Sequence, residues 1–113
     1  MVVQIAGRVL KIRQKNGDRE VPIRLFMPEQ QEPNVWSCRY EIDWPHGAWS
    51  HEAWGVDSAQ ALIVALQLIG TQLYASAYHA QGALILDVPG RGYGFPVPPG
   101  LRQQLIGDDA KNF

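Results

Sequence analysis

Alternating apolar and polar residues predict four strands in the first half of the chain. The clearest alternation lies between Val35 and Trp44, where every second residue is apolar: Trp36, Cys38, Tyr40, Ile42 and Trp44. This period of two is typical of a strand with one face buried and the other in water. Less regular versions of the same pattern predict strands over Val2–Arg13, Arg19–Met27 and Ala48–Val56.

The residues between these strands predict how they connect. Asn16-Gly17 is a strong signal for a tight hairpin between the first two strands. In the first strand the apolar period changes face near Val9 and Leu10, which predicts a bulge or a twist there rather than two separate strands. Pro28–Asn34 is polar and contains two prolines, so we predict a loop. Consecutive strands joined by short turns favour an antiparallel meander.

A long helix is predicted after the fourth strand. Asp57 is a natural N-cap, and Gln60 three residues later makes a variant of the capping box. We expect the helix to run to about Ala80 and to end near Gly82, because glycine commonly follows a helix. Its core stripe is predicted by apolar residues at helical spacing: Leu62, Leu66, Ile69 and Leu73.

Three further apolar residues of this helix lie outside that stripe: Ile63, Val64 and Leu68. A helix exposed to water on its back would not need them, so we expect something to cover the back of its first half. Two alternatives for this covering segment are left open by the sequence. One is the proline-rich C-terminal segment with Phe95 and Val97, and the other is a second copy of the protein in a homodimer.

The rest of the chain completes the predicted fold. Ala83–Val88 is a short apolar segment that extends the sheet or runs beside the helix, and Pro89–Gly100 is an irregular tail with four Pro and four Gly. Leu101–Ile106 is expected to form one helical turn before a polar C-terminal end at 107–113. We therefore predict a single α+β domain over residues 1–106. It is a four-stranded antiparallel meander with one long helix packed on one face, a short fifth strand and a Pro/Gly-rich C-terminal tail.

Composition narrows the class of protein. The 113 residues fit one domain, and the 46% apolar share is too high for intrinsic disorder. A formal charge of -1 gives no overall field for nucleic acid or an anionic membrane, and a single cysteine excludes an internal disulfide. The most apolar run, Ala61–Ile69, is shorter than the roughly 20 residues that cross a bilayer. With no secretory signal pattern at the start, these features predict a soluble cytoplasmic protein.

Charge is unevenly distributed along the chain. The first 24 residues carry six basic and two acidic side chains, a net charge of +4, whereas residues 25–60 carry a net charge of -5. The basic hairpin, with Arg8, Lys11 and Arg13, supports an alternative function as a nucleic-acid-binding or regulatory module. If the second and third strands pair, however, their opposite charges compensate each other on the wet face of the sheet.

Candidate catalytic and metal-binding residues are few. His46, His51 and Glu52 flank one turn, but neighbouring residues on a strand point to opposite faces and so would not share a metal ion. Cys38 lies on the face predicted to be buried, where a thiol is not activated. His79 is placed near a helix C-terminus, where capping is its expected role. We therefore expect no enzyme activity, no cofactor and no metal.

Four tryptophans lie within nineteen residues: Trp36, Trp44, Trp49 and Trp54. The first two fall on the predicted core face. Trp49 and Trp54 have opposite parity in the fourth strand, so at most one of them faces the core if the strand is regular. The other is either a surface anchor for a partner or is covered by the tail. Both are therefore candidate binding residues.

One stretch of the chain resembles a known family. The residues that carry the likeness are Trp36–Ile42, then Gly55-Val56-Asp57-Ser58-Ala59-Gln60-Ala61-Leu62 with Ala65-Leu66-Gln67, and Gly94-Phe95-Pro96. Over about residues 30–98 they resemble a family of small bacterial proteins of unknown function. The resemblance implies a fold rather than an activity, and it supplies no catalytic residues.

The sequence predicts a non-enzymatic protein-binding module. An immunity protein or an inhibitor would be a module of this type. Such a module is favoured by the missing catalytic set, the acidic middle segment and the surplus of aromatic residues. By analogy alone, small bacterial domains of this kind often neutralise a toxin or bind a partner. The expected partner is another protein, with a homodimer through Ile63, Val64 and Leu68 compatible with this function.

Overall fold

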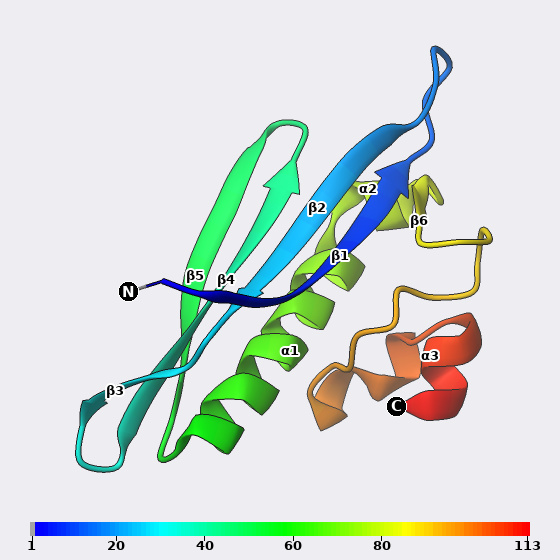
Figure 1. Cartoon of the computed structure of the whole chain (residues 1–113). Coiled ribbons are helices and arrows are strands. Elements are labelled where there is room, and N and C mark those ends of the chain that lie inside the picture. The colour runs from blue at the N-terminus through cyan, green and yellow to red at the C-terminus, as the bar shows by residue number, and fades with distance from the viewer. Residues whose placement is uncertain (1) are drawn as a thin grey trace.

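The computed structural model describes residues 2–113, and Met1 lies outside this range. The described residues form six strands and four helical segments, joined by loops and turns. In chain order the elements are β1 (Gln4–Ile12), β2 (Arg19–Phe26), β3 (Glu29–Glu32), β4 (Val35–Trp44), β5 (Gly47–Gly55), α1 (Ser58–Ala75), α2 (Ala77–Ala80), β6 (Leu84–Ile85), the 3₁₀ helix η1 (Pro99–Gln104) and α3 (Gly107–Asn112). This is the predicted α+β class, and Figure 1 shows the arrangement.

The strands form one antiparallel sheet with the predicted meander order. β1 pairs with β2, β2 with β4, and β4 with β5, while β6 extends the sheet beyond β1. β3 pairs with the start of β4, on the edge that β2 occupies further along. The ladder between β2 and β4 includes only Ile23–Leu25, so Pro22, which has no amide donor, lies just outside it.

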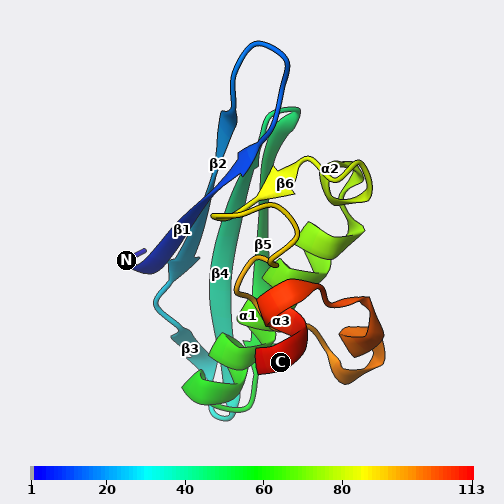
Figure 2. The same cartoon turned by 90° about the vertical axis from the view of Figure 1, so that its right-hand side faces the viewer.

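The helix α1 packs on β4 and β5 and leaves the other face of the sheet open, as the side view in Figure 2 shows. Its capping box is confirmed: Asp57 Oδ1 accepts a hydrogen bond from the Gln60 amide at 2.8 Å, and Gln60 Oε1 accepts one from the Val56 amide at 2.7 Å. The residues of the helix that are fully buried against the sheet are Ala61, Ala65, Ile69 and Leu73.

The core stripe of α1 is therefore shifted from the predicted one. Ile69 and Leu73 are buried as expected, but Leu62 and Leu66 are only half-buried beside the stripe. Alanines occupy the positions nearest the sheet because a small side chain lets the helix approach the strands closely. The larger leucines then pack along the sides of this contact.

The C-terminal tail covers the second half of α1. Tyr93, Phe95 and Val97 are buried, and the carbonyl oxygen of Pro96 lies so close to Gly70 that an added Cβ would be 1.9 Å from it. The tail thus packs on the second half of α1 within one chain, whereas the sequence predicted a cover for the first half. In the first half Val64 and Leu68 are half-buried against the core, whereas Ile63 is 54% exposed.

Four local predictions were wrong. The segment predicted as the loop Pro28–Asn34 contains the strand β3, whose four residues are all exposed and so have no apolar alternation. The long helix ends at Ala75, because Ser76 is extended and its hydroxyl accepts the His79 amide to start α2. The bulge of β1 lies between Gln4 and Ala6 rather than near Val9 and Leu10. Finally, the polar end at 107–113 contains α3.

Length and composition alone would let α1 cross a membrane, since its 18 residues have a mean hydropathy of 1.2. The apolar part of α1 is therefore longer than the nine-residue run Ala61–Ile69 on which the sequence prediction was based. In the fold, one face of α1 packs against β4 and β5 and forms part of the hydrophobic core. Such a helix in a compact α+β fold is typical of a soluble protein.

Candidate functional site

The strand β5 has one unpaired edge. It pairs with β4 along its whole length, from Gly47 opposite Trp44 to Gly55 opposite Trp36, and with no other strand in residues 2–113. It is nine residues long, and Glu52 is its only charged residue. Proteins commonly protect edge strands with charges, prolines or a covering segment, because unpaired backbone groups attract further strands. The long edge of β5 has little of this protection.

The two candidate anchors both lie on β5 and both are exposed. Trp49 is opposite Ile42 and therefore on the helix face of the sheet, while Trp54 is opposite Ser37 on the open face. Their side chains are 41% and 52% exposed. The alternation of side chains along the strand predicted that at most one of the two tryptophans faces the core. In the structure both are exposed, so neither is buried in the core or covered by the tail.

Trp49 is held in place by its neighbours. Its Nε1–H donates a hydrogen bond of 3.3 Å to the hydroxyl of Tyr40, which is buried. The exposed His51 lies beside both rings, with centroid distances of 6.2 Å to Tyr40 and 5.9 Å to Trp49. Burial raises the pKa of Tyr40, and the Trp49 hydrogen bond partly opposes this. An indole oriented in this way loses little conformational entropy when it binds a partner.

A second aromatic group lies at the turn of the same hairpin. Trp44, His46 and Tyr78 stack on one another with centroid distances of 5.4 to 6.2 Å, and His46 Nδ1 is 3.0 Å from the Tyr78 hydroxyl. These rings line a groove of about 450 Å³ between the β4–β5 turn and the C-terminal end of α1. The hairpin that carries Trp49 thus has a second aromatic group at its turn.

The three candidate basic residues do not gather on one surface. Arg8 is on the helix face, where its Nη1 donates to the carbonyl oxygens of Tyr93 and Gly94 at 3.1 and 2.8 Å. Lys11 is on the open face opposite Glu20. Arg13 follows the end of β1. The N-terminal hairpin thus presents no single basic face made of these residues.

Charge compensation between the second and third long strands is confirmed. Arg24 of β2 lies opposite Glu41 of β4, and its Nη2 is 2.8 Å from Asp43 Oδ2, with Nη1 3.6 Å from Glu41 Oε1. These groups raise the pKa of Arg24, chiefly through the hydrogen bond to Asp43. The basic and acidic segments of the sequence therefore meet on the open face of the sheet.

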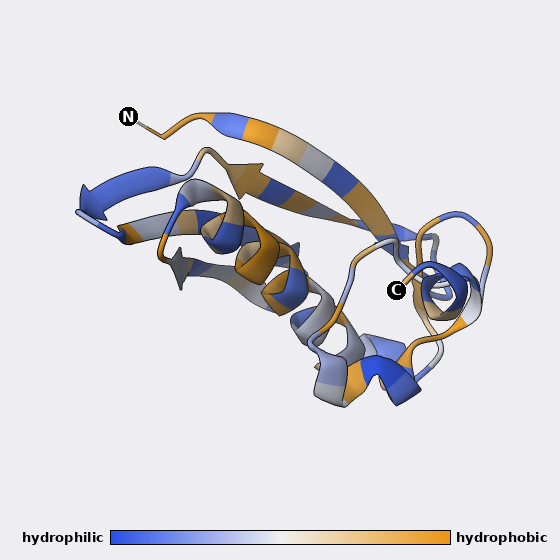
Figure 3. Cartoon of the chain, turned by 90° about the horizontal axis from the view of Figure 1, so that it is seen from below, coloured by the Kyte–Doolittle hydropathy of each residue, from blue (hydrophilic) through white to orange (hydrophobic). Residues whose placement is uncertain are grey.

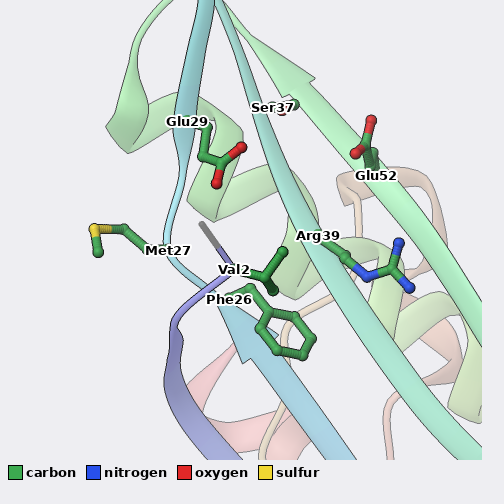
Figure 4. Close-up of a pocket in the computed structure, with 7 residues that line it drawn as sticks. All are labelled: Val2, Phe26, Met27, Glu29, Ser37, Arg39 and Glu52. Atoms are coloured by element: carbon green, nitrogen blue, oxygen red, sulfur yellow. The ribbon is translucent and has the colours of Figure 1, made fainter.

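A small pocket on that open face has no room for an organic ligand. It lies between β3, β4 and β5, and Figure 4 shows Arg39 and Glu52 on its wall with the aromatic ring of Phe26 below. Its volume of about 40 Å³ would hold no more than a few water molecules. Within residues 2–113 there is also no group of three or more His, Cys, Asp or Glu side chains placed to hold a metal ion.

Cys38 is packed in the core, as predicted. It is fully buried, and its thiol donates a hydrogen bond to the carbonyl oxygen of Phe26 at 3.3 Å. Burial raises the pKa of the thiol to about 11. The thiolate, which is the reactive form, is therefore scarce at neutral pH in the folded protein.

This burial predicts that Cys38 reacts with a thiol reagent only after unfolding. At pH 8 a disulfide reagent should modify the native protein far more slowly than the same protein in concentrated urea, because access and ionisation are both restored by unfolding. Stopped-flow absorbance measures both rates. Equal rates would show that the thiol is accessible in the native state and would contradict its placement in the core.

A buried polar network lies in the C-terminal half and was not predicted from the sequence. The carboxylate of Asp109 accepts hydrogen bonds from the Tyr74 hydroxyl at 2.5 Å and from the amides of Tyr93 and Gly94 at 2.8 Å. His79 Nδ1 is hydrogen-bonded to the Tyr93 hydroxyl. Burial lowers the pKa of His79 and raises that of Tyr93 to about 12.

This network closes the tail onto α1 rather than forming a cleft. Gly92 and Gly94 have positive φ, which turns the amides of the glycine-rich segment toward Asp109. The glycine-rich segment thus binds an anion, but this anion is the carboxylate of Asp109 in the same chain. Asp109 is only 2% exposed. The glycine-rich segment therefore acts as a turn of the tail.

Comparison with known proteins gives a family and no function. No curated protein and no solved structure matches the chain. A family model described as a domain of unknown function, DUF6968, matches residues 6–97, which include most of β1, all of β2 to β6, and the buried tail residues Tyr93, Phe95 and Val97. This agrees with the resemblance to a family of unknown function. The chain therefore belongs to the DUF6968 family.

Proposed function

We propose that this protein is a non-enzymatic protein-binding module whose partner adds an extended strand to the free edge of β5. The observation that carries the proposal is the combination of a nine-residue unpaired edge with an exposed tryptophan on each face of the sheet. Strand addition is a common mode of peptide recognition, in which the backbone supplies affinity and alternate side chains supply specificity.

The positions of the two tryptophans fit this mode. Side chains of an added strand alternate between the two faces of the sheet. Those on the helix face would contact Trp49 and His51, and those on the open face would contact Trp54. A partner docking flat on one face would use only one tryptophan. The partner we expect is therefore an extended segment with apolar residues on both of its faces.

The other predicted functions have less support. The nucleic-acid-binding alternative needs a shared basic surface, and Arg8, Lys11 and Arg13 do not form one. A homodimer through Ile63, Val64 and Leu68 stays a prediction, with Ile63 as its exposed member. A cytoplasmic location and an immunity- or inhibitor-type use are likewise part of the proposal.

The proposal predicts that Trp49→Ala and Trp54→Ala each weaken the partner complex by at least about 1–2 kcal/mol, since each removes a large anchor. Ser50→Lys is expected to weaken it as well, because a lysine on an edge strand discourages further pairing. The measurement is capture from a lysate of the source organism with immobilised wild-type and variant proteins, followed by titration of the recovered partner.

Val9→Ala is the matched control, since Val9 is an exposed apolar residue on the open face of β1, away from β5. It should bind as the wild type does. A partner that binds both tryptophan variants with unchanged affinity would contradict the proposal. A dimer of the protein itself that is lost in these variants would show that a second copy occupies the edge instead.

A further inference from the structure

An apolar pocket lies on the other side of α1 from the β5 edge. It has a volume of about 280 Å³, and β1, β2, α1 and the tail each contribute to its wall. Figure 3 shows β1, α1 and the C-terminal segment surrounding this region when the molecule is viewed from below. The apolar side chains on the wall include those of Ile23, Leu25, Leu66, Ile69 and Phe95.

The pocket exists because α1 covers only part of the sheet. The helix packs on β4 and β5, so the helix face of β1 and β2 depends on the tail for its cover. Beside the tail, β1 contributes Ala6, whose small side chain on the helix face leaves the space between the strand and Leu66 unfilled, and Gly7 also lines the pocket. A volume near 300 Å³ is at the lower end of the range for small-ligand sites.

One cation lines this otherwise apolar pocket. Arg8 is half-buried, its guanidinium carbon is 5.0 Å from the centre of the Phe95 ring, and Nη1 donates to the carbonyl oxygens of Tyr93 and Gly94. A guanidinium has five N–H donors. Among residues 2–113 the arginines that form ion pairs are Arg24, Arg39 and Arg91, so Arg8 has no carboxylate partner there.

We propose that this pocket binds a small monocarboxylic acid with an apolar body, whose carboxylate pairs with Arg8. A partly buried cation is stabilised by an anion, and a guanidinium matches the planar geometry of a carboxylate. The wall of apolar side chains would surround the body of such a ligand. The inference does not depend on the proposed function, because it uses a different face of the molecule and different residues.

The test is a titration of the wild-type protein with sodium octanoate, followed in ¹H–¹⁵N correlation spectra. Octanoate should bind with shifts at the amides of Gly7, Arg8 and Gly94. Octanamide, which has the same length but no charge, should bind at least about tenfold more weakly, because it lacks the charge-assisted contact. This comparison of ligands needs no variant and so does not depend on whether a variant folds.

Variants locate the site. Arg8→Gln should weaken octanoate binding at least about tenfold while Arg8→Lys retains much of it, since lysine keeps the charge. Ala6→Leu should fill the pocket and reduce binding without touching the guanidinium. Val9→Leu adds the same kind of bulk on the opposite face of β1 and should leave binding unchanged.

Each of the following results would overturn the inference. They are no shifts at 5 mM octanoate, equal affinity for octanoate and octanamide, and shifts that cluster away from the pocket. Octanoate binding that is unaffected by both Arg8→Gln and Ala6→Leu would also contradict it. Phe113 lines the mouth and is 42% exposed, so Phe113→Ala tests whether this ring competes for the space, in which case octanoate binds more tightly.

Discussion

Replacing Asp109 with alanine is expected to lower the free energy of unfolding by about 4 kcal/mol, because each buried donor left without an acceptor costs about 1–3 kcal/mol. The substitution leaves three donors unsatisfied: the Tyr74 hydroxyl and the amides of Tyr93 and Gly94. Because this carboxylate joins α3 and the tail to α1, the loss of its hydrogen bonds should destabilise the whole fold. Urea unfolding followed by circular dichroism measures it.

The neighbouring residue supplies the control. Asp108 has an exposed side chain and forms a surface ion pair with Arg91 at 3.0 Å. Asp108→Ala should therefore change the free energy of unfolding by less than about 1 kcal/mol, as is usual for exposed pairs. If the two substitutions had equal effects, Asp109 would not be the centre of a buried network.

Gly70→Ala is the second substitution with a large expected effect, a loss of about 3 kcal/mol of folding free energy through overpacking. The new Cβ would lie 1.9 Å from the carbonyl oxygen of Pro96 and 3.2 Å from Val97. Either the tail or the helix has to move, and the buried Phe95 moves with the tail. Alanine favours helix formation over glycine by about 1 kcal/mol, so the measured loss already includes this gain.

Gly100→Ala makes the same chemical change where there is open space, since no atom lies within 4 Å of the added Cβ. Its unfolding free energy should stay within about 0.5 kcal/mol of the wild type, as for most surface substitutions. Thermal unfolding of both variants provides the comparison. A Gly70→Ala protein as stable as the wild type would mean that the tail does not pack on the helix at this point.

Much of the fold was predictable because burial leaves a periodic pattern. The strand Val35–Trp44 and the cap at Asp57 follow from local rules, and both are confirmed. β3 was missed for the same physical reason: its residues bury nothing, so only pairing with β4 makes it a strand. α3 was missed because its stability depends on hydrogen bonds from Asp109 to residues 15 or more positions away.

The candidate site was predictable in part. Parity within one strand showed that Trp49 and Trp54 face opposite sides, but the sequence could not show that β5 is the edge strand. Edge position depends on the order of strands, which is a property of the whole sheet. The stacking of Trp44 with Tyr78 joins residues 34 positions apart and has no local signal. The pocket beside Arg8 likewise depends on where α1 stops covering the sheet.

The most direct test of the proposed function is amide hydrogen exchange across β5, measured by NMR in the free protein and in complex with the captured partner. The amides of Gly47–Gly55 that point to the free edge should exchange rapidly in the free protein and slowly in the complex, at alternate residues, since strand addition engages every second amide. Unchanged exchange along β5, with protection appearing around Ile63 of α1 instead, would contradict strand addition and place the partner on the helix.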